Sequence, residues 1–142
     1  GHGNNFWQNI VGKPKHNTWL GMAYERIVMS HIDQIKASMG IEGIYTQFYS
    51  WRSKTLVPKA QIDLILERSD RIINLCEIKY SEASYVINKE EDMKFRNRLY
   101  AFKTETGTRC AVQPTYITTF GLQPNIYTSE IIHSLTLDDL FR

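Results

Sequence analysis

Residues 61–79 read QIDLILERSDRIINLCEIK, and this stretch decides the fold. Residues 61–66 are apolar apart from Gln61 and Asp63, and residues 72–78 form a second apolar run, so each segment predicts a β-strand. The polar segment 67–71 between them has the composition of a turn. We therefore expect an antiparallel hairpin in the middle of the chain.

The hairpin is preceded by a predicted helix and a predicted strand. Apolar residues recur every three or four positions from Leu20 to Ile35, which is typical of an amphipathic helix. Asn17 or Thr18 can cap the start of this helix, and Gly40 lies where a left-handed C-cap belongs. The next segment, residues 44–51, is rich in β-branched and aromatic side chains and predicts a strand.

Beyond the hairpin the sequence predicts a long helix and then one or two strands. Asn88 and Glu91 form a variant capping box, and Gly107 ends the helix. Residues 111–120 predict a fourth strand, and residues 131–135 a short fifth one. The expected order is therefore helix, three strands, helix, strand.

Length and composition indicate one globular domain. The chain has 142 residues, of which 42% are hydrophobic and 23% charged, and this excludes a disordered or low-complexity segment. The net charge of +2 does not identify a partner. Two cysteines, no apolar run near the ~20 residues that span a bilayer, and no signal peptide lead us to expect a cytoplasmic protein with no membrane contact. We interpret residues 1–16 as a leader or linker that begins with a cloning scar, Gly1 to Gly3, and residues 17–142 as one domain.

The hairpin places charged residues at one end of one face. If the turn is centred on Asp70, paired residues sum to 140, so that Asp63 faces Glu77 and Gln61 faces Lys79. Side chains alternate along a strand, and the opposite face is then apolar apart from Asn74. The apolar residues expected on that opposite face are Ile62, Leu64, Leu66, Cys76 and Ile78.

Two opposed carboxylates in a half-buried sheet need compensation. A shared proton, the neighbouring Lys79, or a divalent cation such as Mg²⁺ can supply it, and Mg²⁺ often uses only one or two protein carboxylates. Glu25 borders the apolar stripe of the first helix and is a further acid near the core. The alternative is a solvated face with an ordinary pair between Glu77 and Lys79, and spacing alone leaves both readings open.

Five segments carry a resemblance to a known family. The hairpin motif resembles the signature of the PD-(D/E)XK nuclease superfamily, and residues 21–25 resemble the acidic first-helix motif that accompanies it. The resemblance covers roughly residues 18–122. More specifically, the chain is similar to the nuclease-like C-terminal domain of prokaryotic AAA-type ATPases in the segments QIDLI (61–65), LCEIKYS (75–81), YVINK (85–89) and ITTFGL (117–122).

The resemblance implies a fold and a set of roles. The fold is an α/β (α+β) restriction-endonuclease-like core, a central mixed sheet of four to five strands flanked by two helices in the order αβββαβ. Asp63 and Glu77 would bind Mg²⁺ or Mn²⁺, with the Ile78 carbonyl as a further ligand. Lys79 would be the catalytic lysine, and Glu25 would hold a second metal ion or a metal-bound water. One departure is Ile62, which stands where the motif has proline beside the acid.

Basic residues near this motif are candidates for nucleic-acid contact. Arg52 and Lys54 follow the first predicted strand in a region that contains no acid between Glu42 and Asp63. Lys89 and Lys103, at the two ends of the second predicted helix, are weaker candidates that can reach the site. The interleaved aromatics Tyr45, Phe48, Tyr49 and Trp51 can stack on unpaired bases, but we expect most of them to face the core.

Two functions from different classes follow. The first is a metal-dependent nuclease domain that hydrolyses DNA, as the C-terminal part of an AAA-type ATPase or as its partner. The second is a catalytically inactive module of the same fold that binds nucleic acid or regulates an ATPase partner. No P-loop pattern occurs in these residues, so an ATPase module would be separate from them. The resemblance also allows a homodimer.

Overall fold

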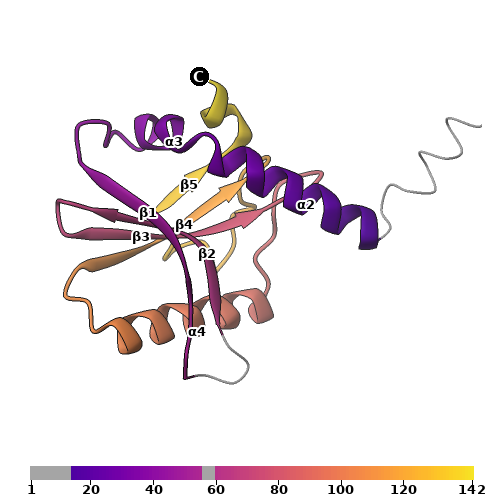
Figure 1. The fold of residues 1–142 in the computed structure, drawn as a ribbon. Helices are drawn as coiled ribbons and strands as arrows, with labels where there is room; N and C mark the ends of the chain where they lie inside the picture. The colour runs from indigo at the N-terminus through magenta and orange to yellow at the C-terminus, as the bar shows by residue number, and fades with distance from the viewer. Residues whose placement is uncertain (1–13, 56–59) are drawn as a thin grey trace, which may run out of the picture.

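The computed structural model describes residues 14–55 and 60–142. Its elements run in the order helix, helix, three strands, helix, two strands and a 3₁₀ turn (Figure 1). Their bounds are α2 Pro14–Met29, α3 Ile32–Ser38, β1 Thr46–Arg52, β2 Gln61–Arg68, β3 Ile72–Lys79, α4 Lys89–Thr106, β4 Ala111–Thr118, β5 His133–Leu135 and η1 Leu137–Phe141.

The five strands form one mixed sheet in the order β1-β2-β3-β4-β5. The β1–β2 and β2–β3 pairs are antiparallel, whereas the β3–β4 and β4–β5 pairs are parallel. Helix α4 makes the crossover between the parallel strands β3 and β4, as parallel pairing requires. The expected α/β fold with a mixed sheet and the order αβββαβ is therefore confirmed.

Helices cover both faces of the sheet (Figure 1). On one face, α2, α3 and η1 pack on an apolar cluster that includes Leu64, Leu66, Cys76 and Ile117. On the other face, α4 packs through Phe95 and Phe102 on Ile65, Leu75 and their neighbours. β3 lies in the middle of the sheet between these two layers, and most side chains on β3 and on β2 beside it are buried.

The first helix is broken where the sequence predicts a single one. α2 ends at Met29 and α3 begins at Ile32, so the sheet is flanked by three helices rather than two. At the break, the Ser30 hydroxyl donates to the Ile27 carbonyl at 2.9 Å, and the His31 ring contacts the same carbonyl at 2.6 Å. These side chains compete with the backbone donors that would continue the helix. The helix also begins at Pro14, before the expected caps Asn17 and Thr18.

Local signals at the other element ends are confirmed. The Asn88 side chain accepts a hydrogen bond from the Glu91 backbone at 2.8 Å, and Gly107 ends α4 at φ +61°. Only half of the expected capping box is present, because the Glu91 side chain forms an ion pair with Lys79. The fifth strand forms as β5, shortened to three residues.

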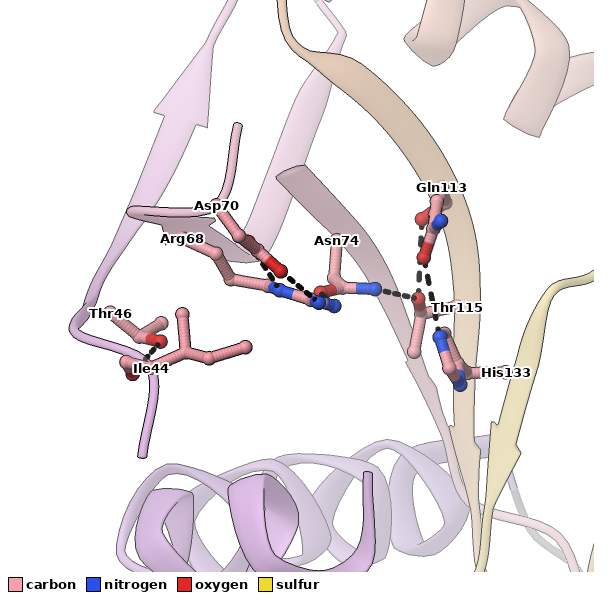
Figure 2. Close-up of polar contacts among 8 residues, drawn as sticks. All are labelled: Ile44, Thr46, Arg68, Asp70, Asn74, Gln113, Thr115 and His133. Atoms are coloured by element: carbon pink, nitrogen blue, oxygen red, sulfur yellow. Dashed lines mark hydrogen bonds and ion pairs between the residues drawn. The ribbon is translucent and has the colours of Figure 1, made fainter. Parts of the chain in front are cut away.

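A buried polar row crosses the sheet at the end opposite to Lys79 (Figure 2). Arg68 donates to both carboxylate oxygens of Asp70 and to Asn74, whose amide donates to Thr115 at 3.2 Å. His133 extends the row to β5 through the Gln113 side chain at 3.2 Å. Arg68, Asn74 and Thr115 are buried and each has a hydrogen-bond partner, so the row links β2, β3 and β4 through satisfied side chains.

In the described part of the chain, no helix is long and apolar enough to cross a membrane.

Candidate functional site

A bulge in the sheet decides where Asp63 points. Tyr49 of β1 pairs with Ile65, but Trp51 pairs with Ile62, so β2 uses one residue more than β1 over this step. As a result, Ile62 packs in the α4 cluster together with Ile65, while Leu64 packs against α2. The expected two-residue alternation is therefore wrong at this point, and Ile62 does not join the face on which it was predicted.

The expected pairing of Asp63 with Glu77 does not form. The β2–β3 register has the expected sum of 140 from Leu64–Cys76 to Glu67–Ile73, and the ladder ends there. Glu77 continues on β3 paired with Tyr116 of β4, because β2 turns away to follow β1. The hairpin and its register were predicted correctly, but the two acids are not cross-strand neighbours.

Asp63 instead interacts with residues of α2 and, through Gln61, with β1. Gln61 connects it to β1: the Gln61 amide donates to Asp63 Oδ1 at 3.0 Å and accepts from Arg52 Nη2 at 3.0 Å. The negative charge of Asp63 also acts on Glu25 of α2. Burial raises the pKa of Glu25, and the charge of Asp63 raises this pKa further.

The position of Glu25 is fixed by the residue before it. The Tyr24 hydroxyl is buried and donates to the Thr118 carbonyl at the end of β4, at 2.7 Å. This bond ties α2 to the carboxyl ends of the central strands. Glu25, the next residue, is then held half-buried above the same end of the sheet.

Glu77 lies in a separate cluster under α4. Its carboxylate is 8% exposed, accepts from Arg98 Nη1 at 2.6 Å, and lies 3.9 Å from Lys79 Nζ. Lys79 also contacts Glu91 at 3.4 Å. Burial raises the pKa of Glu77, whereas the positive charges of Arg98 and Lys79 oppose that rise. A solvated Glu–Lys pair on an exposed strand is thus excluded, since Glu77 is in the interior.

An open hollow of ≈ 540 Å³ connects the two groups of charges. Glu25 lines it from α2, and Ile78 and Lys79 line it from the end of β3. The residues after β3 form the remaining wall, and Ser81 is held there by reciprocal hydrogen bonds with Thr119, at 3.1 and 2.6 Å. The hollow is therefore bounded by elements that are fixed to the sheet.

The predicted nucleic-acid residues are dispersed. Arg52 lies beside Gln61 at the edge of the acid group, and the Lys54 backbone is bound by Glu105 at 2.8 Å near the end of α4. Lys89 and Lys103 are both exposed, but they are 14 residues apart on one helix, about 21 Å. Because Glu91 contacts Lys79, Lys89 is at the end of α4 nearer to the hollow and Lys103 is at the far end.

Sequence reasoning missed Arg98 and the role of Glu91. Both lie on the buried stripe of α4, with Glu91, Phe95, Arg98 and Phe102 at alternating steps of four and three residues. Two charged residues on an otherwise apolar stripe predict a buried ion pair with whatever strand lies beneath. That signal was present in the sequence.

The acids do not form a single cluster. Within residues 14–55 and 60–142, no group of three or more acidic, histidine or cysteine side chains is arranged to hold a metal ion. The negative charge of Asp63 acts on Glu25, and in the described residues neither carboxylate forms an ion pair. Two carboxylates completed by water are a donor set that Mg²⁺ uses in proteins, so this pair fits such an ion.

Comparisons with known proteins show the fold alone. No family model matches the sequence, and no curated protein matches it. Among solved structures, the chain is similar to the crystal structure of a protein of unknown function, AF1548, with a TM-score of 0.53 and 16% sequence identity. The similarity covers 82% of this chain and 64% of that one, so this chain spans less than two thirds of the length of its structural neighbour.

Proposed function

We propose that this chain is a metal-dependent nuclease domain of the PD-(D/E)XK type that hydrolyses DNA phosphodiester bonds, as the C-terminal part of an AAA-type ATPase or its partner. One observation carries the proposal: Glu25 and Lys79 line a single open hollow, and the charge of Asp63 acts on Glu25 there. Carboxylates next to a lysine at the carboxyl end of a central strand can bind a cation and a phosphate together. The ATPase partner and a cytoplasmic location rest on the resemblance and composition.

Asp63 and Glu25 are the residues that would hold Mg²⁺ or Mn²⁺. The Ile78 carbonyl belongs to the wall of the same hollow and is a candidate for a further oxygen ligand. When bound, the ion would polarise the phosphodiester and lower the pKa of a water molecule. Glu77, which the resemblance also assigns to the metal, would first have to exchange its contact with Arg98.

Lys79 is the residue that we propose as the catalytic lysine. Its side chain is about one quarter exposed, and its ammonium group lies between two carboxylates, Glu77 at 3.9 Å and Glu91 at 3.4 Å. These two contacts restrict the rotamers of Lys79. Held there, Lys79 binds a non-bridging phosphate oxygen of the substrate and orients the attacking water.

Metal-dependent thermal stabilisation tests the proposed ion site. Mg²⁺ or Mn²⁺ should raise the Tm of the wild type and have much less effect on Glu25→Gln, because a ligand that binds only the folded state stabilises it. Without metal, Glu25→Gln should be slightly more stable than the wild type, because the repulsion by Asp63 is lost. The exposed Glu42→Gln is the matched control. Equal metal effects in all three proteins would remove the site.

Cleavage of labelled DNA with Mn²⁺ tests the activity. We expect the wild type to cut, and Lys79→Ala and Asp63→Asn to lose cutting while they retain the wild-type fold by circular dichroism. Cutting that persists in both variants would place the activity elsewhere or in a contaminant.

The inactive module is the second candidate, and the Glu77–Arg98 contact favours it. At 2.6 Å, this contact occupies a carboxylate that the nuclease motif would use for metal. Binding of DNA without cleavage, by the wild type and by Lys79→Ala alike, would support a binding or regulatory role. Metal-dependent cleavage that Lys79→Ala abolishes would reject it.

A further inference from the structure

The outer strand of the sheet presents aromatic side chains to solvent. Tyr45, just before β1, is 70% exposed and Phe48 is 56% exposed; Tyr49 is also exposed. The expectation that these residues face the core holds only for Trp51, which packs edge-on against Phe102 at 5.4 Å. Because side chains alternate along a strand, Phe48 lies on the same face as Leu66, whereas Tyr49 lies with Trp51 on the α4 face. An exposed large apolar side chain such as Phe48 is a candidate contact for a ligand.

This strand leads directly to the proposed acid site. Phe48 and Arg52 are four residues apart and so lie on the same face of β1, about 13 Å from each other. Arg52 donates to Gln61, and Gln61 donates to Asp63, whose charge acts on Glu25. A ligand laid along β1 from Phe48 to Arg52 therefore reaches the carboxylates.

The charges on this strand suit a polyanion. Residues 43–62 contain no acid, and Arg52 and Lys54 are both exposed at the end of β1. Glu67 and Glu105 reach β1 from other elements and already accept hydrogen bonds, Glu67 from the Tyr49 hydroxyl and Glu105 from the Lys54 backbone. The positive side chains of Arg52 and Lys54 are thus available to phosphates near the exposed Phe48 ring.

We infer that β1 is the binding platform for an unpaired DNA strand, with a base stacked on Phe48 and phosphates contacted by Arg52 and Lys54. Aromatic rings stack only on bases whose faces are open, and in a duplex those faces are covered by neighbouring bases. The substrate class of the proposed nuclease is therefore single-stranded DNA, or the unpaired part of a branched structure. This inference rests on the proposed function for the meaning of the adjoining acid site.

Binding without cleavage tests the inference. Fluorescence anisotropy of a labelled 20-nucleotide thymidylate strand in EDTA measures affinity when no metal-dependent cutting can occur. Phe48→Thr, which replaces the ring by a β-branched side chain that suits a strand, should weaken binding about 5- to 30-fold. The control Tyr100→Ala, a 69% exposed aromatic on α4, should change it less than twofold. Arg52→Ala should make the salt dependence shallower by about 0.7 log units per log unit of salt.

Several outcomes overturn the inference. The inference fails if Phe48→Thr binds the thymidylate strand with wild-type affinity, or if Tyr100→Ala loses as much affinity as Phe48→Thr. It also fails if Phe48→Thr loses as much affinity for a duplex that contains the same strand. A dimer in sedimentation that Phe48→Thr dissociates would show that β1 pairs with a second copy of this chain instead.

The inference and the proposed function fail in different assays. If thymidylate binding depends on Phe48 but Mn²⁺ produces no cleavage, the platform stands and the nuclease does not. If cleavage depends on Lys79 but not on Phe48, the nuclease stands and the platform does not.

Discussion

Replacing Arg98 by methionine should destabilise the protein in a pH-dependent way. Arg98 is the closest cation to the buried Glu77 carboxylate, at 2.6 Å. Methionine keeps the apolar stem of the side chain and removes its charge and its donors. The variant therefore leaves the Glu77 carboxyl group in the interior. Of its two described cations, Lys79 at 3.9 Å remains.

The expected loss is about 2 kcal/mol at pH 7. Two unit charges about 4 Å apart at an effective dielectric constant of about 20 attract each other by about 4 kcal/mol. The Arg98 side chain is 24% exposed and Lys79 remains in place, so we expect about half of this value. Breaking a fully buried pair typically costs about 3–5 kcal/mol. We expect a smaller loss here because the Arg98 side chain is partly exposed to solvent.

The pH dependence follows from the protonation of Glu77. Burial already raises its pKa, and the loss of Arg98 raises it further above the unfolded value. A raised carboxyl pKa favours the folded state below the unfolded pKa, and this advantage is lost as the pH rises through the folded pKa. The variant should therefore be closest to the wild type near pH 5 and furthest from it near pH 8.

Urea unfolding at pH 5 and pH 8 measures both effects. A loss of about 2 kcal/mol lowers the urea midpoint by about 1–2 M for a domain of this size. The control is Arg96→Met on the same helix, where a 58% exposed side chain pairs with Asp92, and its loss should stay below about 1 kcal/mol at both pH values. Equal losses in the two variants, or a larger Arg98→Met loss at pH 5, would refute the reasoning.

Three further predictions concern the fold around the site. Tyr24→Phe removes the hydroxyl that donates to the Thr118 carbonyl and should lower the free energy of unfolding by about 1–2 kcal/mol, measured by urea titration. An unchanged free energy of unfolding would mean that water replaces the hydroxyl. Gly107→Ala should cost about 1 kcal/mol, because φ is +61° although no atom lies within 4 Å of an added Cβ, whereas Gly43→Ala, also with open space, should be neutral in the same thermal melts. Burial raises the pKa of the Cys76 thiol, so a thiol reagent should modify it only at the rate of unfolding, and rapid modification of the native protein would contradict its placement in the core.

Much of the fold is predictable because its signals are local. Asn88 and Gly107 mark the ends of α4 through cap geometry that involves only neighbouring residues. The polar turn around Asp70 fixes the register of β2 and β3 for the same reason. At these ends of elements a single cap or turn residue decides the boundary, and the sequence predicts it correctly.

The errors arise where distant elements decide the outcome. The bulge that redirects Asp63 depends on how β1 pairs with β2, and no residue in β2 announces it. The break at Ser30 and His31 depends partly on the contact of the His31 ring with Phe141, 110 residues away, with ring centroids 4.9 Å apart. Alternation within a strand predicts which face of the sheet each side chain is on only while the register with the neighbouring strand is unbroken.

The candidate site was predicted as residues but not as geometry. Glu25, Ile78 and Lys79 do line one hollow, and the charge of Asp63 acts on Glu25. Glu77 lies on the α4 face, as alternation from Leu75 requires, and it pairs there with Arg98, a residue whose position on the apolar stripe of α4 was not used; the bulge in β2 separates Asp63 from it. A charged residue on a buried helix stripe is thus as informative as an acid on a strand.

Because of the bulge in β2, the number of residues in this strand determines which way Asp63 points. Losing one residue there would restore strict alternation and leave the apolar run 64–66 in its present register with β3. The acid at position 63 would then turn from α2 toward α4, and toward Glu77. A single codon deletion, with no substitution anywhere in the core, would therefore regroup the carboxylates at this end of the sheet.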